Sequence, residues 1–86
     1  MDFRQLQYII QVAECGSITK AAAKLYITQP SLSNYISKLE RELGVALFDR
    51  SISPIRPTPA GEEYIKDAKR ILYIQEQLEK KLSDLS

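Results

Sequence analysis

The sequence predicts a mainly α-helical domain with three helices, a short β-hairpin and one long final helix. Three observations support this fold class. Apolar residues recur with the helical period in the early segments and through the last third of the chain. Helix-capping residues and glycines separate those segments. Residues 45–58 instead carry short apolar runs around a polar, turn-prone stretch, which is typical of a small hairpin.

Length and charge limit what the chain can do. Its 86 residues suffice for one small domain and an appended helix. A unit of this size is only marginally stable without a partner. The hydrophobic fraction of 44% and the charged fraction of 27% are those of a soluble globular protein. The net charge of the chain is +1. Residues 1–58 contain seven Lys or Arg and five Asp or Glu, whereas residues 59–86 contain five Lys or Arg and six Asp or Glu. An anionic partner is therefore expected to meet only the first part.

Several function classes have little support in the composition. The sequence has no histidine, no Gly-rich phosphate loop and no metal-ligand cluster, so we expect no enzymatic activity, cofactor or metal. A single cysteine, Cys15, excludes an intrachain disulfide and fits a reducing, cytoplasmic location. That cysteine is either a small residue at a helix end or a redox sensor. No signal peptide or membrane-spanning run is present, and no membrane partner is expected.

The first helix is predicted to run from Asp2 or Phe3 to about Glu14. Gly16 follows it and is suited to the C-terminal end of a helix. The face expected to pack consists of Phe3, Leu6, Ile10 and Ala13, with Ile9 beside them.

A helix-turn-helix is predicted over residues 18–37. Ser17 can cap a second helix from Ile18 to Leu25, whose small residues Ala21 and Ala22 allow close packing. Residues 26–28 form the turn, with Ile27 expected to fill the angle between the helices. Thr28 can then cap the third helix, which Gly44 ends after Leu43.

The third helix has two unlike faces. At about 100° per residue, Leu32, Ile36, Leu39 and Leu43 lie within a band of roughly 60°. The opposite side carries short or basic residues, namely Pro30, Ser33, Asn34, Ser37, Lys38 and Arg41. Short hydroxyls and amides followed by cations can approach a surface closely, and DNA base edges and phosphates fit such a face. The alternative is an ordinary solvated helix surface.

The hairpin is predicted from Val45–Phe48 and Ile55–Thr58, joined by polar residues 49–54. Pro54 and Pro57 limit its pairing because proline has no backbone N–H. Arg50 and Arg56 are candidates for contact with a phosphate or the minor groove, the alternative being solvated hairpin charge.

The final helix is predicted from Thr58 or Pro59 to about Leu85. Its apolar stripe alternates steps of four and three, the heptad period, and comprises Tyr64, Ala68, Ile71, Gln75, Leu78, Leu82 and Leu85. About 27 residues at 1.5 Å each give roughly 40 Å, too long for a small head to cover. We therefore expect dimerisation with a second copy, the alternative being packing on its own head. Gln75 either sets the register of that contact or faces water.

Five motifs occur together in one order and cover essentially the whole chain. They are Ser17-Ile-Thr-Lys-Ala-Ala-Ala-Lys-Leu25, Gln29-Pro-Ser-Leu-Ser33, Leu39-Glu-Arg-Glu-Leu-Gly44, Leu47-Phe-Asp-Arg50 and Thr58-Pro-Ala-Gly61. The set resembles the N-terminal DNA-binding region of LysR-type transcriptional regulators. The resemblance implies a winged helix-turn-helix over 1–58, with its wing at about 45–58, and a linker helix over 59–86 that forms a homodimer, usually antiparallel. It also implies a C-terminal domain that senses a small-molecule effector and is absent from this chain, which we expect to be a piece of a longer protein.

The resemblance further implies roles for single residues. Gln29, Pro30 and Ser33 match the start of the family's recognition helix, which enters the major groove of double-stranded DNA. Position 34 is often arginine in the family and is Asn34 here, which favours adenine over guanine or phosphate. We expect Gln29, Ser33 and Asn34 to read bases of an inverted repeat. The residues expected on phosphates are Thr28, Ser31, Ser37, Lys38 and Arg41.

The wing departs from the family pattern in one respect. Arg50 matches its leading arginine, but a second arginine common about three residues later is Ser53 here, leaving Arg56 to compensate. Fewer cations predict weaker non-specific binding and a shallower salt dependence than is usual for the family. The same shortage supports an alternative hypothesis, in which the head is a protein-interaction module and the long helix an assembly element.

Overall fold

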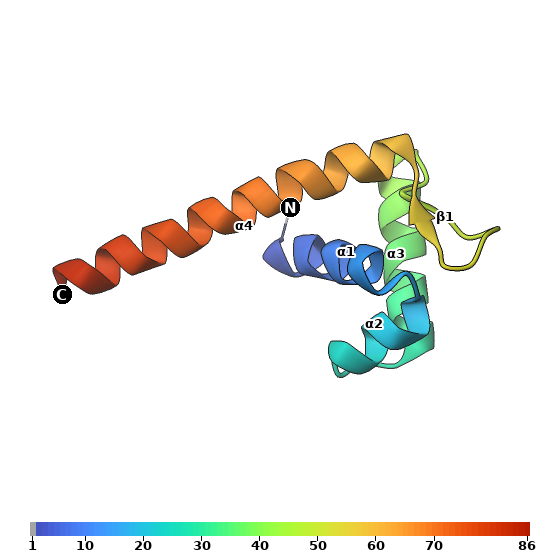
Figure 1. Ribbon diagram of the computed structural model, residues 1–86, viewed down its shortest axis with the longest axis horizontal. Coiled ribbons are helices and arrows are strands. Elements are labelled where there is room, and N and C mark those ends of the chain that lie inside the picture. The colour runs from blue at the N-terminus through green and yellow to red at the C-terminus, as the bar shows by residue number, and fades with distance from the viewer. Residues whose placement is uncertain (1) are drawn as a thin grey trace.

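The computed structural model describes residues 2–86, which form four helices and one two-stranded sheet. In chain order the elements are α1 (Phe3–Cys15), α2 (Ile18–Lys24), α3 (Gln29–Leu43), β1 (Phe48–Asp49), β2 (Arg56–Pro57) and α4 (Pro59–Leu85). The first three helices and the sheet form a head, and α4 packs on α1 and then extends well beyond it (Figure 1). The predicted fold class is confirmed.

Side-chain caps begin the last three helices, at Ser17 and Thr28 as predicted and also at Thr58. Ser17 Oγ accepts a hydrogen bond from the Lys20 N–H at 3.1 Å, and Thr28 Oγ1 accepts one from the Ser31 N–H at 3.2 Å. Thr58 Oγ1 accepts from the Gly61 N–H at 3.0 Å and starts α4. Each cap satisfies an N–H that has no partner within its own helix.

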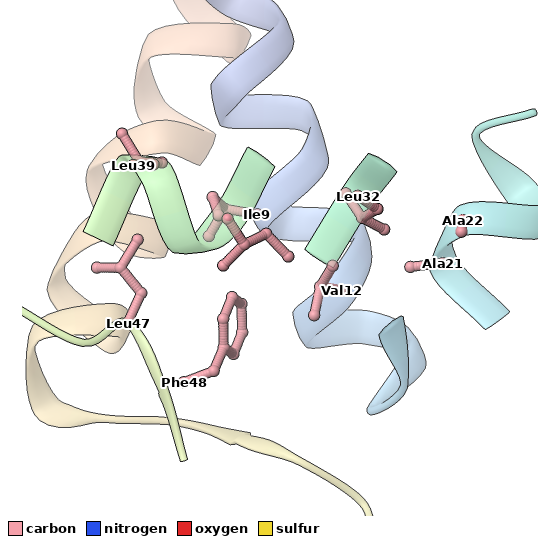
Figure 2. Packing of buried hydrophobic residues seen from close by; sticks show 9 residues of the cluster. Ile9, Val12, Ala21, Ala22, Leu32, Leu39, Leu47 and Phe48 are labelled. Carbon is pink, nitrogen blue, oxygen red and sulfur yellow. The ribbon is translucent and has the colours of Figure 1, made fainter. Parts of the chain in front are cut away.

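The core lies where α1, α3 and the base of the hairpin meet. Its buried residues are Ile9, Val12, Ala21, Ala22, Leu32, Ile36, Leu39, Leu47 and Phe48. In Figure 2 the Phe48 ring points up toward Ile9. Helix α2 contributes the partly buried Ile18 and two fully buried alanines, Ala21 and Ala22. Because the alanine side chains are so short, α2 can lie close against its neighbours, as expected.

The buried face of α1 differs from the predicted one. Leu6, Ile9 and Val12 are buried, whereas Phe3 is 46% exposed and Ile10 and Ala13 are only half-buried. The true stripe is rotated by about 80°, at 100° per residue, from the predicted stripe. Since α1 is apolar on several sides, the elements packed around it decide which side is buried.

The end of α3 also differs from the prediction. Leu32, Ile36 and Leu39 are buried, but Leu43 is 49% exposed. Leu43 lies in the last turn of the helix, beyond the part that the other helices cover. It lines an open apolar groove with Val45 and with Ile71 of α4.

The two strands are shorter than predicted and begin later. Phe48 pairs with Pro57 and Asp49 pairs with Arg56, in antiparallel register. Val45 lies outside the sheet and is 44% exposed. The backbone N–H of Leu47 does not join a ladder, because it donates instead to the Glu40 carboxylate at 2.6 Å.

The single heptad stripe predicted for α4 is in fact two apolar faces. Gly61, Ile65 and Ala68 face the head, and Ala68 is only 1% exposed within the chain. Tyr64 is half-buried and packs on the core. A dimer contact at Ala68 is therefore wrong, because its own head already covers that residue.

The second face of α4 remains open. Beyond the head, Ile74, Leu78, Leu82 and Leu85 are 55–83% exposed. Gln75 is half-buried and lines an apolar groove with Phe3 and Leu78. No helix within residues 2–86 is long and apolar enough to cross a membrane.

Candidate nucleic-acid interface

One face of α3 is free of packing and carries the predicted base-reading residues. Gln29, Pro30, Asn34 and Arg41 are exposed along it, and Ser33 is half-buried at its edge. In Figure 1 the wing, residues 45–58, projects on the side of α3 away from α1. A helix with a free polar face beside a protruding hairpin has the shape required to enter a DNA groove.

The N-terminal end of this face is fixed by two hydroxyls. Thr28 Oγ1 donates to Ser31 Oγ at 2.9 Å while also accepting from the Ser31 N–H. The Thr28 proton is thus used within the chain, and the free hydroxyl proton is that of Ser31. Of these two predicted phosphate contacts, only Ser31 keeps an unused hydroxyl donor.

Arg50 lies against the side of α3 rather than at the tip of the wing. Its Nη2 is 3.1 Å from Glu40 Oε1, and its Nη1 donates to Ser37 Oγ at 3.3 Å. The side chain nevertheless remains 36% exposed. The structure therefore brings Arg50 and Ser37, two of the predicted residues, into direct contact.

Glu40 connects α3 to the base of the wing, and the sequence did not single it out. Its Oε2 accepts from the backbone N–H groups of Leu47 and Phe48, at 2.6 and 3.3 Å, while Oε1 pairs with Arg50. Only 15% of its side chain is exposed. No local pattern could reveal this role, because the partners lie seven to ten residues away across a turn.

The exposed part of the wing carries mixed charge. Arg56 on β2 is exposed and pairs in register with Asp49 on β1. The Asp49 carboxylate accepts from the Ser51 hydroxyl at 2.6 Å and from the Ser51 N–H at 2.9 Å, which lowers the pKa of Asp49 below its usual range. Asp49 thus stays ionised and offsets part of the positive charge of the wing.

The wing is also attached to the rest of the head. The Ile55 N–H donates to the Gly16 carbonyl at 3.0 Å, while within the wing the Thr58 N–H donates to the Leu47 carbonyl at 3.0 Å. A β-carbon on Gly16 would come within 2.8 Å of Pro54, so the two segments pack closely. The hairpin therefore holds a defined place beside α3.

Lys38 lies on the opposite flank of α3 from Arg50. It borders a small hollow with Gln5 of α1, Tyr35 and Glu42. Tyr35 packs edge to face on Tyr8 at 4.9 Å between ring centroids, and burial raises its pKa. Tyr35 is thus partly a packing residue, and Lys38 remains exposed at the rim.

A protein-family model described as the bacterial regulatory helix-turn-helix protein of the lysR family matches residues 3–62. The chain belongs to the LysR family. Among curated relatives of this LysR-family chain is the HTH-type transcriptional regulator ClcR of Pseudomonas putida, 46% identical over 76 residues that make up 88% of this chain and 26% of ClcR. Another is BenM of Acinetobacter baylyi, 42% identical over 91% of this chain and 26% of BenM. The chain thus spans about a quarter of the length of these relatives.

Solved structures of relatives share the whole arrangement of this LysR-family chain. The crystal structure of the BenM_DBD/benA site 1 DNA complex superimposes with a TM-score of 0.93 at 39% identity, covering 99% of this chain and 96% of that one. The CbnR_DBD–DNA complex superimposes with a TM-score of 0.88 at 39% identity, covering 99% and 98%. The head and the extended α4 are therefore features shared with these structures.

Proposed function

We propose that this chain is the DNA-binding and dimerisation part of a bacterial LysR-type transcriptional regulator, with α3 in the major groove and the wing on an adjacent groove or the backbone. One observation supports it above the others. The exposed polar face of α3 lies beside the wing in a fold that superimposes on BenM_DBD, a protein crystallised with its DNA site. Helices of such heads read base edges through their N-terminal residues.

The proposed contacts divide by chemistry. Gln29, Ser33 and Asn34 read base edges, since their short polar groups lie at the start of the free face. The residues placed on phosphates are Ser31, Ser37, Lys38, Arg41, Arg50 and Arg56, with Thr28 acting mainly through its cap and Pro30 through shape. Phosphate contacts set the position of the head, and base contacts set its sequence preference.

The operator is proposed to be an inverted repeat bound by a homodimer. The head, residues 1–58, reads one half-site, and the linker, residues 59–86, pairs with a second copy through the open face of α4. A two-fold dimer places its heads near one helical turn apart, about 34–36 Å, or a multiple of it. Ile74 joins the predicted Leu78, Leu82 and Leu85 in this face.

The whole regulator is proposed to carry a C-terminal domain that binds a small-molecule effector and to act in the bacterial cytoplasm without catalysing a reaction. Curated relatives such as ClcR and BenM are about three and a half times as long as this chain and are named transcriptional regulators. That length leaves ample room for a further domain of typical size.

The test begins with selection of binding sites from random DNA, which supplies the half-site and its spacing. The selected duplex and a scrambled duplex are then titrated with the chain at two salt concentrations. We expect tighter binding to the selected duplex, and we expect both affinities to fall as salt rises. Equal affinity for the two duplexes would contradict the recognition proposal.

A second candidate function is that of a protein-interaction module. The observation in its favour is that Arg50 is already paired with Glu40, while the net charge of the chain is only +1. A double variant, Lys38→Ala with Arg50→Ala, discriminates the two. We expect this double variant to weaken DNA binding. The control is Lys66→Ala with Lys69→Ala, which removes the same amount of charge at exposed positions of α4, away from α3. Unchanged affinity in the first variant would favour the second function.

A further inference from the structure

The Glu40 carboxylate joins three parts of the head that the sequence separates. One oxygen accepts the backbone N–H groups of Leu47 and Phe48 at the base of the wing. The other oxygen pairs with the Arg50 guanidinium, which also reaches Ser37 on α3. One side chain of α3 therefore sets both the position of the wing and the orientation of its leading arginine.

The two halves of this contact have different physical effects. The backbone N–H of Leu47 is mostly removed from water and would lose its partner without the Glu40 oxygen, which destabilises the wing. The ion pair with Arg50, by contrast, is partly solvated and adds little stability. Its main effect is to restrict a long side chain that otherwise samples many rotamers.

A guanidinium held in this way can still bind DNA. Arg50 has five N–H donors, and the contacts with Glu40 and Ser37 use two of them. The remaining donors suit a phosphate oxygen, and the side chain is 36% exposed on the flank of the free α3 face. Because it is already oriented, binding does not have to order it.

We propose that Glu40 is a positioning residue for DNA recognition: it holds the Arg50 guanidinium beside Ser37 so that Arg50 meets a phosphate only when α3 is correctly seated in its groove. This inference rests on the DNA-binding function proposed above. The negative charge of Glu40 also lowers the attraction of this flank for DNA in general. The pair therefore favours the operator over random sequence.

Glu40→Gln separates the two halves of the contact. The glutamine oxygen can accept from Leu47 and Phe48 as before, while its NH2 group faces Arg50 and cannot pair with a cation. We expect the variant to keep the thermal stability of the parent chain and to bind the selected operator about fivefold to tenfold more weakly. Affinity for scrambled DNA is expected to stay level or to rise. Glu42→Gln is the matched control. Glu42 is exposed and lies two residues from Glu40, and its substitution by glutamine changes the charge by the same amount.

A double-mutant cycle with Arg50→Ala tests whether Glu40 acts through Arg50. If it does, Glu40→Gln changes the ratio of operator to scrambled affinity in the parent chain and leaves it unaltered in the Arg50→Ala background. An equal loss in both backgrounds would overturn the inference, because Glu40 would then act only on the fold. Tighter operator binding by Glu40→Gln would also overturn it, because the pair would then merely mask Arg50. Absence of any operator preference in the parent chain would instead reject the proposed function itself.

Discussion

At the scale of single residues, Tyr64 shows a conflict between packing and polarity. Its ring packs against the core from α4, but its hydroxyl oxygen is buried without a hydrogen-bond partner in the part of the chain described, residues 2–86. Burial accordingly raises the pKa of this phenol. An unpaired buried hydroxyl reduces stability by about 1–3 kcal/mol, so removing it should help the fold.

Tyr64→Phe is predicted to be stabilising by about 1 kcal/mol at neutral pH, since it keeps the ring and deletes the unpaired group. Urea unfolding followed by circular dichroism measures the change. A raised pKa means that wild-type stability is complete below the ordinary pKa of 10.0 and is lost as the pH rises through the folded-state value. The variant should therefore lose less stability than the wild type at alkaline pH. Some loss remains in the variant, because the pKa of Tyr35 is also raised. A destabilised variant at pH 7 would contradict the argument.

Asn34 is the residue at which base preference is predicted to depart from that of relatives carrying arginine. Asparagine can pair with both the N6 and N7 edges of adenine. Asn34→Ala should reduce discrimination at one operator position by about 1–3 kcal/mol and leave affinity for scrambled DNA nearly unchanged. Site selection repeated with the variant identifies that position. A uniform loss across all sequences would instead assign Asn34 to the phosphate backbone.

At the scale of elements, the joint between the wing and α4 holds the head together. Gly61 is buried where α4 begins, directly against the Leu47 carbonyl. Thr58 caps the helix and also donates its hydroxyl to the Ala46 carbonyl at 2.6 Å. The same segment that ends the wing therefore starts the linker, and neither can shift without the other.

Gly61→Ala is predicted to disrupt this joint. The added β-carbon would lie 1.9 Å from the Leu47 oxygen, a backbone atom that cannot rotate away. We expect a loss of about 3 kcal/mol or more in unfolding free energy, measured by thermal and urea denaturation.

Gly44→Ala is the control for the Gly61 variant, because no atom lies within 4 Å of its added β-carbon. Its φ of +73° still disfavours alanine, by about 1 kcal/mol. Gly44→Ala should therefore lose less unfolding free energy than Gly61→Ala. The reverse order would show that the packing at Gly61 relaxes easily.

At the scale of the whole molecule, the head and α4 differ in how their apolar residues are covered. The head has its own core, whereas α4 extends beyond it along a molecule whose longest dimension is 48 Å. The distal half of α4 exposes Ile74, Leu78, Leu82 and Leu85 on one side. An amphipathic helix without a cover for its apolar side is stabilised by a second helix, and in our proposal that helix belongs to another copy.

Leu78→Lys is predicted to weaken this dimer by an order of magnitude or more in Kd, because it places a charge within the apolar contact. Sedimentation equilibrium of the 86-residue chain measures the change. Tyr73→Lys is the matched control, since Tyr73 is also exposed, at 62%, but lies about 140° around the helix from Leu78. A parent chain that is monomeric at tens of micromolar would contradict the proposed dimer outright.

Local chemistry explains why much of this protein is predictable from its sequence. Ser17, Thr28 and Thr58 cap helices through hydroxyls only three residues away from their partners, and Gly16 and Gly44 end helices through their own backbone freedom. The polar face of α3 follows from helical periodicity alone. The order of helices, hairpin and long helix, and the free face proposed to read DNA, were therefore determined by the sequence itself.

Contacts between distant segments were decided only by the tertiary structure. The rotation of the buried stripe on α1, the division of the α4 stripe into a covered and an open face, and the Glu40–Arg50 pair each depend on which element lies beside which. Periodicity shows that a helix has an apolar side but does not identify what covers it, and charge counting does not show which charges meet. Those choices depend on packing in three dimensions, where a neighbour seven or forty residues away can lie as close as the next turn of the helix.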